Sequence, residues 1–77
     1  MKTVTVYGAD WCPLTKRAIA HLEQMKIDFR YIDIDQNPRA AKWVRAQNGG
    51  KEIKPTIDIG GEVLSEPSDA ELEAALL

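Results

Sequence analysis

The segment WCPLT at residues 11–15 follows the strand-like segment TVTVY at residues 3–7, and together they decide the predicted fold. Polar and β-branched residues alternate in the earlier segment, which is typical of a strand. Pro13 suits the first turn of a helix, because its φ angle fits there and its missing N–H would lack a helical partner anyway. The sequence therefore predicts a strand, a short loop with Cys12, and a helix that begins at Pro13.

Cys12 is the single cysteine of the chain, and its position at a helix start favours a reactive thiol. Unpaired N–H groups and the dipole of a helix N-terminus stabilise an anion, so we expect the thiolate to form easily. A second cysteine three positions later would complete a redox pair, but that position holds Thr15. Cys12 is therefore predicted to act as a nucleophile without an internal disulfide partner.

Length and charge restrict the possible functions. A chain of 77 residues suits one small domain over residues 1–77. Ten basic and twelve acidic residues are spread along it and give a net charge of -2, so no nucleic-acid footprint or membrane helix is predicted. The residues after Met1 follow a strand pattern rather than that of a signal sequence, and we expect a cytoplasmic monomer.

The chain continues with a helix, a strand and a second helix. The apolar side of the first helix is expected from residues at spacings of three and four, namely Leu14, Ala18, Leu22 and Met25. The apolar run 29–34 predicts a strand that is buried on both faces and parallel to the first, since a helix connects the two. Asp35 or Asn37 would cap the second helix, which Pro38 starts and Gly49-Gly50 end.

The last third of the chain predicts a hairpin and a third helix. Gly60-Gly61 can supply the positive φ angles of a tight turn between short strands at residues 56–59 and 62–65. Ser68 and Glu71 match a capping box that would open the last helix. The resulting order βαβαββα predicts an α/β fold with a four-stranded mixed sheet and three helices.

The order of elements and several short motifs resemble the glutaredoxin family of the thioredoxin fold. The motifs are the triplet Trp11-Cys12-Pro13, the step Lys54-Pro55-Thr56 and the turn Gly60-Gly61. Residues 48–56 and the step Pro67-Ser68 are most similar to the short, mycoredoxin-type members. The resemblance covers essentially the whole chain, and it implies a thiol–disulfide oxidoreductase in which Cys12 is the nucleophile and faces a cis Pro55.

The same resemblance implies a groove that binds glutathione or another low-molecular-weight thiol, with no metal. Lys54 would offer its backbone N–H and C=O to the cysteinyl part of the thiol, as an added strand does. Lys51 would meet the glycyl carboxylate, and Ser68 and Asp69 would receive the γ-glutamyl end at a helix start. Thr56 is assigned to the same groove.

Departures from the family pattern change the expected chemistry. Thr15 leaves only a monothiol cycle, in which Cys12 takes up the thiol of a mixed disulfide and a second thiol releases it. The Thr15 hydroxyl could also donate to the thiolate.

Other departures lie close to Cys12. Many relatives carry a basic residue at the position of Ala9, and Asp10 opposes thiolate formation, so we expect weaker activation of the Cys12 thiolate than in those relatives. Leu14 would change how partner proteins dock. Residues expected to support the active loop are Trp11, Pro13, Thr15 and Pro55.

Two functions from different classes follow from these residues. The first is a monothiol oxidoreductase that acts on the mixed disulfides of small thiols, including glutathionylated proteins. The alternative is a non-catalytic thioredoxin-fold module for binding or redox sensing. In one form of this alternative, Cys12 is one ligand of an iron–sulfur cluster shared between two subunits. That form is less favoured, because Pro13 stiffens the loop and crowds the sulfur.

Overall fold

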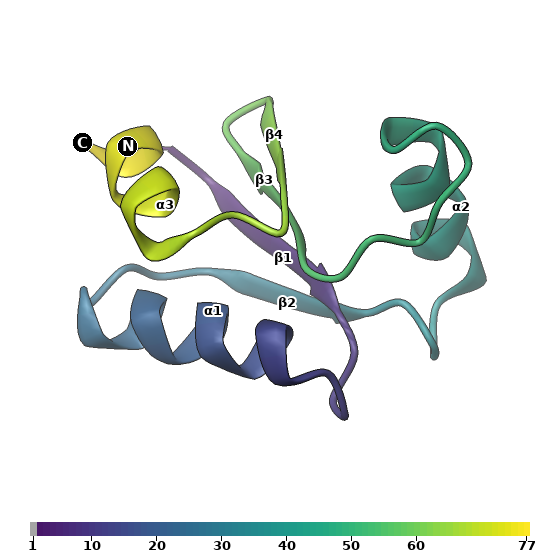
Figure 1. The fold of residues 1–77 in the computed structure, drawn as a ribbon, viewed down its shortest axis with the longest axis horizontal. Coiled ribbons are helices and arrows are strands. Elements are labelled where there is room, and N and C mark those ends of the chain that lie inside the picture. Colours follow the sequence, from purple (N-terminus) through teal and green to yellow (C-terminus); the bar gives the residue numbers. More distant parts are fainter. Residues whose placement is uncertain (1) are drawn as a thin grey trace.

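The computed structural model describes residues 2–77 and has the predicted order of elements. In chain order these are β1 (Val4–Gly8), α1 (Pro13–Gln24), β2 (Arg30–Asp33), α2 (Pro38–Gln47), β3 (Thr56–Ile59), β4 (Glu62–Ser65) and α3 (Asp69–Leu76). The prediction of an α/β fold with a four-stranded sheet and three helices is confirmed (Figure 1).

The four strands form one mixed sheet in the order β2-β1-β3-β4. β1 and β2 are parallel, while β3 is antiparallel to both β1 and β4. The expectation that the second strand is buried on both faces is wrong, because β2 is an edge strand with exposed or half-buried residues. Its apolar run is explained by the two faces of the sheet, since Tyr31 packs against one core cluster and Ile32 against the other.

Helices cover both faces of the sheet. α1 and α3 lie on one face, where their side chains pack on strand residues of β1 and β3, and α2 lies on the opposite face (Figure 1). The larger core cluster contains Val4, Val6, Ala18, Leu22, Ile57, Ile59, Leu72 and Ala75. Val4 is paired with Ile59 and Val6 with Ile57 across the β1–β3 ladder, so the larger cluster is continuous across the two central strands. The ends of β1, α1 and α3 are therefore held in fixed relative positions.

The predicted caps and turns fix where the elements begin and end. Asn37, rather than Asp35, caps α2, and its Oδ1 accepts a hydrogen bond from the N–H of Ala40 at 3.0 Å. Ser68 and Glu71 form the predicted capping box of α3. The β3–β4 turn has φ angles of 59° at Gly60 and 99° at Gly61, as the hairpin requires.

The inward face of α1 differs from the expectation at its first turn. Leu14 is 46% exposed, whereas Thr15 is only 1% exposed and shares the buried side of the helix with Ala18 and Leu22. Gly8 explains the difference, because a Cβ at that position would collide with the Thr15 side chain. A glycine at the end of β1 thus lets the first turn of α1 approach with Thr15 inward.

Candidate active site

Cys12 lies in the loop between β1 and α1 and is the N-cap residue of α1. Its N–H donates to the carbonyl of Ala9 at 3.0 Å, and its carbonyl accepts from the N–H of Lys16 at 3.1 Å. Pro13 follows at the first helical position, as predicted. The side chain is 7% exposed, so the sulfur is sheltered while it remains at the helix start.

The surroundings of Cys12 favour its thiolate. Burial raises the pKa of the Cys12 thiol, but hydrogen bonds from the Thr15 hydroxyl and from the N–H groups of Thr15 and Leu14 lower it. The positive charge of Lys54 lowers it further, and the net effect is a pKa below the ordinary value of a thiol. The direction agrees with the sequence-based expectation for a cysteine at a helix start.

Thr15 is built into the pocket of the thiol. Its hydroxyl oxygen accepts a hydrogen bond from the N–H of Ala9 at 3.4 Å, and the same hydroxyl donates to the Cys12 sulfur. The side chain is almost fully buried against Gly8. The residue three positions after the cysteine therefore supports the thiolate instead of supplying a second thiol.

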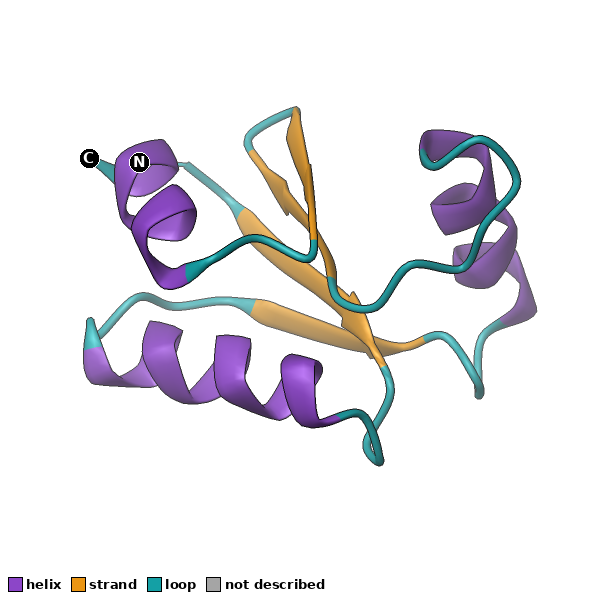
Figure 2. Cartoon of the chain, in the orientation of Figure 1, coloured by secondary structure: helices purple, strands orange, loops and turns teal. Residues whose placement is uncertain are grey.

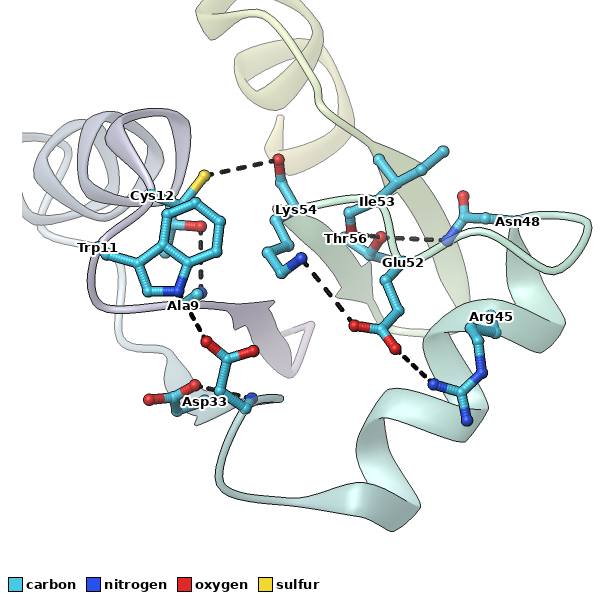
Figure 3. A network of polar contacts seen from close by, with 12 residues as sticks. Ala9, Trp11, Cys12, Asp33, Arg45, Asn48, Glu52, Ile53, Lys54 and Thr56 are labelled. Carbon is cyan, nitrogen blue, oxygen red and sulfur yellow. Dashed lines mark hydrogen bonds and ion pairs between the residues drawn. The ribbon is translucent and has the colours of Figure 1, made fainter.

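An extended loop connects α2 to β3 (Figure 2). Its residue Lys54 lies next to Cys12. The Lys54-Pro55 peptide bond is cis, which confirms the prediction. The Lys54 carbonyl lies 3.9 Å from the Cys12 sulfur and accepts from its thiol (Figure 3). Lys54 therefore presents a backbone carbonyl and a positive charge to the same sulfur.

Trp11 is held in place although 64% of its surface is exposed. Its indole N–H donates to Asp35 at 2.7 Å, and the Lys54 ammonium lies 5.4 Å from its ring centroid, within the range of a cation–π contact. Asp10, expected to oppose the thiolate, accepts a hydrogen bond from the Tyr31 hydroxyl at 2.7 Å. Trp11 thus forms a fixed apolar surface beside Cys12.

A chain of charged residues connects Lys54 to α2. Glu52 forms ion pairs with Arg45 and, at 4.0 Å, with the Lys54 ammonium (Figure 3). The sequence analysis did not predict that Glu52 pairs with Arg45 and Lys54. The position of Glu52 between Lys51 and Lys54, just before the predicted cis proline, was the one signal for such an ion pair. Lys51 lies in the same loop and is exposed.

Thr56 shapes the loop before β3 from within. Its side chain is fully buried, and its hydroxyl donates to the carbonyl of Ile53 at 2.7 Å. The same hydroxyl oxygen accepts from the Asn48 amide at 3.2 Å, and the amide oxygen of Asn48 accepts from the Ser65 hydroxyl. These bonds join the end of α2 to β3 and β4, so Thr56 contributes through the shape of the loop and not through contact with the surface.

A cavity of about 260 Å³ lies beside this loop, between the starts of α1 and α3. Three residues predicted for the site, Pro55, Ser68 and Asp69, line it together. Lys51, Lys54 and Thr56 are not among its lining residues. Some predicted site residues thus lie at the Cys12 sulfur and others line the cavity, whereas Lys51 and Thr56 do neither.

Arg17 and Glu66 also line the cavity and were missed by sequence reasoning. The guanidinium of Arg17 lies 3.8 Å from the Asp69 carboxylate, and His21 lies 3.8 Å from the same oxygen. Arg17 could have been recognised from its spacing, because it follows Leu14 by three residues and therefore shares a helix face with it. Asp69, expected to receive the γ-glutamyl end of the thiol together with Ser68, is already close to two side chains of α1.

No group of three or more His, Cys, Asp or Glu side chains in residues 2–77 is arranged to hold a metal ion. The same residues contain no helix with the length and apolar character needed to cross a membrane.

Comparisons with known proteins agree with the fold. Mycoredoxin 1 of Corynebacterium glutamicum is 39% identical over 57 residues, which are 74% of this chain and 70% of that protein. The structure of the Escherichia coli glutaredoxin-like protein NrdH-redoxin matches with a TM-score of 0.84 at 25% identity, over 94% of this chain and 92% of that one.

Two further findings extend the comparison. A glutaredoxin of Archaeoglobus fulgidus has a TM-score of 0.86 over 99% of this chain and 87% of its own, and at 23% identity it supports the fold alone. The family model for glutaredoxin matches residues 4–64, a range that includes Cys12, Lys54 and the cis Pro55. The chain therefore belongs to the glutaredoxin family, whose members are thiol–disulfide oxidoreductases with thiol co-substrates.

Proposed function

We propose that this protein is a monothiol oxidoreductase that acts through Cys12 on mixed disulfides of glutathione or a similar low-molecular-weight thiol. The observation that carries the proposal is the position of the Cys12 sulfur. It has a lowered pKa at a helix start, faces the Lys54 carbonyl, and lies near a cavity large enough for part of a small ligand. The proposal takes residues 1–77 as one domain.

The reaction needs one protein thiol and two steps. The Cys12 thiolate attacks the small-thiol sulfur of a protein mixed disulfide, a Cys12–small-thiol disulfide forms, and the protein thiolate leaves and takes a proton. A second small-thiol thiolate then attacks the small-thiol sulfur of this adduct. The products are a small-thiol disulfide and the free Cys12 thiolate, so the electrons come from the small thiols.

Each site residue has a proposed role in holding the adduct. The Lys54 backbone pairs with the cysteinyl part, and the ammonium of Lys54 stabilises the thiolate before attack and after release. Ser68 and Asp69, which line the cavity, contact the far end of the thiol. Lys51 is assigned to the glycyl carboxylate. Trp11, Pro13 and Thr15 hold the loop, while Thr56 and Pro55 shape the opposite wall.

The proposed setting is the cytoplasm, with the protein as a monomer. Reducing thiol pools keep a lone cysteine free in that compartment, and they supply the second thiol of the cycle. Glutathionylated proteins are the proposed protein substrates, because their exposed mixed disulfides can approach a cysteine flanked by the exposed Trp11.

The first step can be tested by mass spectrometry. After mixing with a glutathionylated peptide, the natural chain should gain one glutathione on Cys12 and release a free peptide thiol. Cys12→Ser should gain none, because a serine hydroxyl at neutral pH does not attack a disulfide. The absence of an adduct on the natural chain in excess substrate would contradict the proposed mechanism and favour a non-catalytic binding module.

A further inference from the structure

Lys54 differs from the other lysines of the chain, because its side chain lies within the site. It is only 17% exposed, whereas every other lysine of the protein is an exposed residue. A lysine ammonium is strongly hydrated and normally stays in water while its stem packs on the surface. Lys54 therefore needs specific neighbours that hold its charge beside Cys12.

The indole of Trp11 is the first such neighbour. The Nζ atom of Lys54 lies 5.4 Å from the centroid of the Trp11 ring, and tryptophan offers the most favourable ring face for a cation. The indole is fixed at another edge, because its N–H donates to the Asp35 carboxylate at 2.7 Å. The N–H of Asp35 in turn donates to the Asp33 carboxylate at 2.9 Å. The exposed Trp11 side chain is thus oriented so that its face meets Lys54.

The carboxylate of Glu52 is the second neighbour (Figure 3). One of its oxygens lies 4.0 Å from the Lys54 ammonium, which is beyond hydrogen-bond distance. The other oxygen is paired with Arg45. Because Arg45 shares this carboxylate, Glu52 does not neutralise Lys54 alone. The Lys54 ammonium keeps a positive charge that acts on Cys12 and lowers the pKa of its thiol.

We propose that Trp11 is a positioning residue for the reaction of Cys12, because its indole face holds the Lys54 ammonium beside the sulfur. Lys54 acts on the thiolate directly, whereas Trp11 acts through Lys54. Without the indole the ammonium can turn into water or toward Glu52, and the sulfur then loses part of the nearby positive charge. This inference rests on the proposed function, since it concerns the same nucleophile, and it deepens that proposal by naming what keeps the nucleophile ionised.

The rate of Cys12 alkylation against pH tests this role. The Cys12 thiolate displaces iodide from iodoacetamide, so the rate at neutral pH follows the ionised fraction of the thiol. Lys54→Met keeps the bulk of the side chain without its charge, and should slow the reaction at pH 7 by about tenfold, as expected for the loss of a nearby opposite charge. Trp11→Leu should slow it by about threefold, the size of an exposed cation–π contact.

The double variant decides whether Trp11 acts through Lys54. When Trp11→Leu is combined with Lys54→Met, the rate should equal that of Lys54→Met alone, because no ammonium is left to position. At high pH, where Cys12 is ionised in every form, the four rates should be similar. A threefold loss from Trp11→Leu in both backgrounds, or the same loss at every pH, would overturn the inference, since Trp11 would then act on the loop or on access to the sulfur.

Lys42→Met is the control for net charge. Lys42 is an exposed lysine of α2, and its substitution removes the same charge as Lys54→Met does. It should leave the alkylation rate at pH 7 unchanged. An equal slowing in Lys42→Met and Lys54→Met would contradict a local action of the Lys54 ammonium.

The natural chain provides a second test that needs no substitution at Trp11. The ring current of an indole shields protons that lie over its face, so the Cε protons of Lys54 should resonate upfield of those of the exposed lysines. The same chemical shift for Lys54 as for the exposed lysines would show that the indole does not hold the ammonium.

The results also separate this inference from the proposed function. If a glutathionylated peptide transfers its glutathione to Cys12 while Trp11→Leu leaves the alkylation rate unchanged, the role of Trp11 is contradicted and the proposed function stands. If the alkylation rates change as expected but Cys12 takes up no glutathione in excess substrate, the proposed function fails while the positioning of Lys54 by Trp11 stands.

Discussion

Thr15 shows how one residue can change the chemistry of the site without disturbing its structure. Its hydroxyl accepts from the Ala9 N–H and donates to the Cys12 sulfur, and its methyl group packs against Gly8. A hydrogen bond to a charged atom contributes more than one between neutral groups. Thr15 therefore stabilises the form of Cys12 that reacts with disulfides.

Thr15→Val should slow the reaction of Cys12 with iodoacetamide at pH 7 by about tenfold, which corresponds to the loss of one hydrogen bond to a charged group of about 1.5 kcal/mol. The pKa of Cys12 is lowered in the natural chain, so the loss of a donor moves it upward and leaves less thiolate at neutral pH. The measurement is the alkylation rate against pH. Thr15→Ser keeps the hydroxyl and serves as control, and a Thr15→Val curve that superimposes on that of the natural chain would exclude this role.

The residues around the sulfur could be predicted only in part. Cys12 at the start of a helix and Pro13 follow from local patterns in the sequence, whereas the cis Pro55 was implied by the family resemblance, and the structure has all three. The ammonium of Lys54 next to the sulfur and its partner Glu52 could not be predicted in this way. They depend on the path of a loop 40 residues away, and no local spacing encodes it.

The junction of β1 and α1 is the element-level feature that places Cys12 at the helix start. β1 ends at Gly8, α1 begins at Pro13, and the two meet through the contact of Gly8 with Thr15. The spacing of apolar residues predicted that Leu14 faces the core, but the missing Cβ of Gly8 lets Thr15 take that place. Helical periodicity alone leaves the rotation of a helix end uncertain when a small neighbour admits a polar side chain.

Gly8→Ala should reduce the free energy of unfolding by about 2 kcal/mol, because its new Cβ collides with the Thr15 side chain in a packed region. Thr15→Ala removes the atoms that collide. The double variant should therefore lose less free energy of unfolding than the two single variants lose in sum, as measured by urea unfolding. Additive effects of the two substitutions would show that the contact does not fix this junction.

At the scale of the whole molecule, the sheet holds three separate segments around one site. α1 and its N-cap supply Arg17 and Cys12, the loop before β3 supplies Lys54 and Pro55, and α3 supplies Asp69. Capping signals and alternation predicted the individual elements, and the family resemblance predicted their arrangement. The charge pattern of the cavity could not be predicted, because it arises where α1 meets α3, more than 40 positions apart in the chain.

Leu72 connects α3 to the larger core cluster and is fully buried. Leu72→Ala should lower the free energy of unfolding by about 3 kcal/mol, through the lost apolar contacts and the cavity left behind. Leu77→Ala is the control, since Leu77 is 97% exposed and its change should remain within about 0.5 kcal/mol. Equal effects in urea unfolding would mean that α3 is not anchored through Leu72.

Steady-state reduction of a glutathionylated peptide tests the central claim most directly. The assay follows release of the peptide thiol, with glutathione or a second low-molecular-weight thiol as the reductant, for the natural chain and for Cys12→Ser. The account predicts catalytic turnover by the natural chain with its lone cysteine, and none by Cys12→Ser. Release by the natural chain no faster than by Cys12→Ser with either thiol would contradict the claim that Cys12 is a monothiol catalyst.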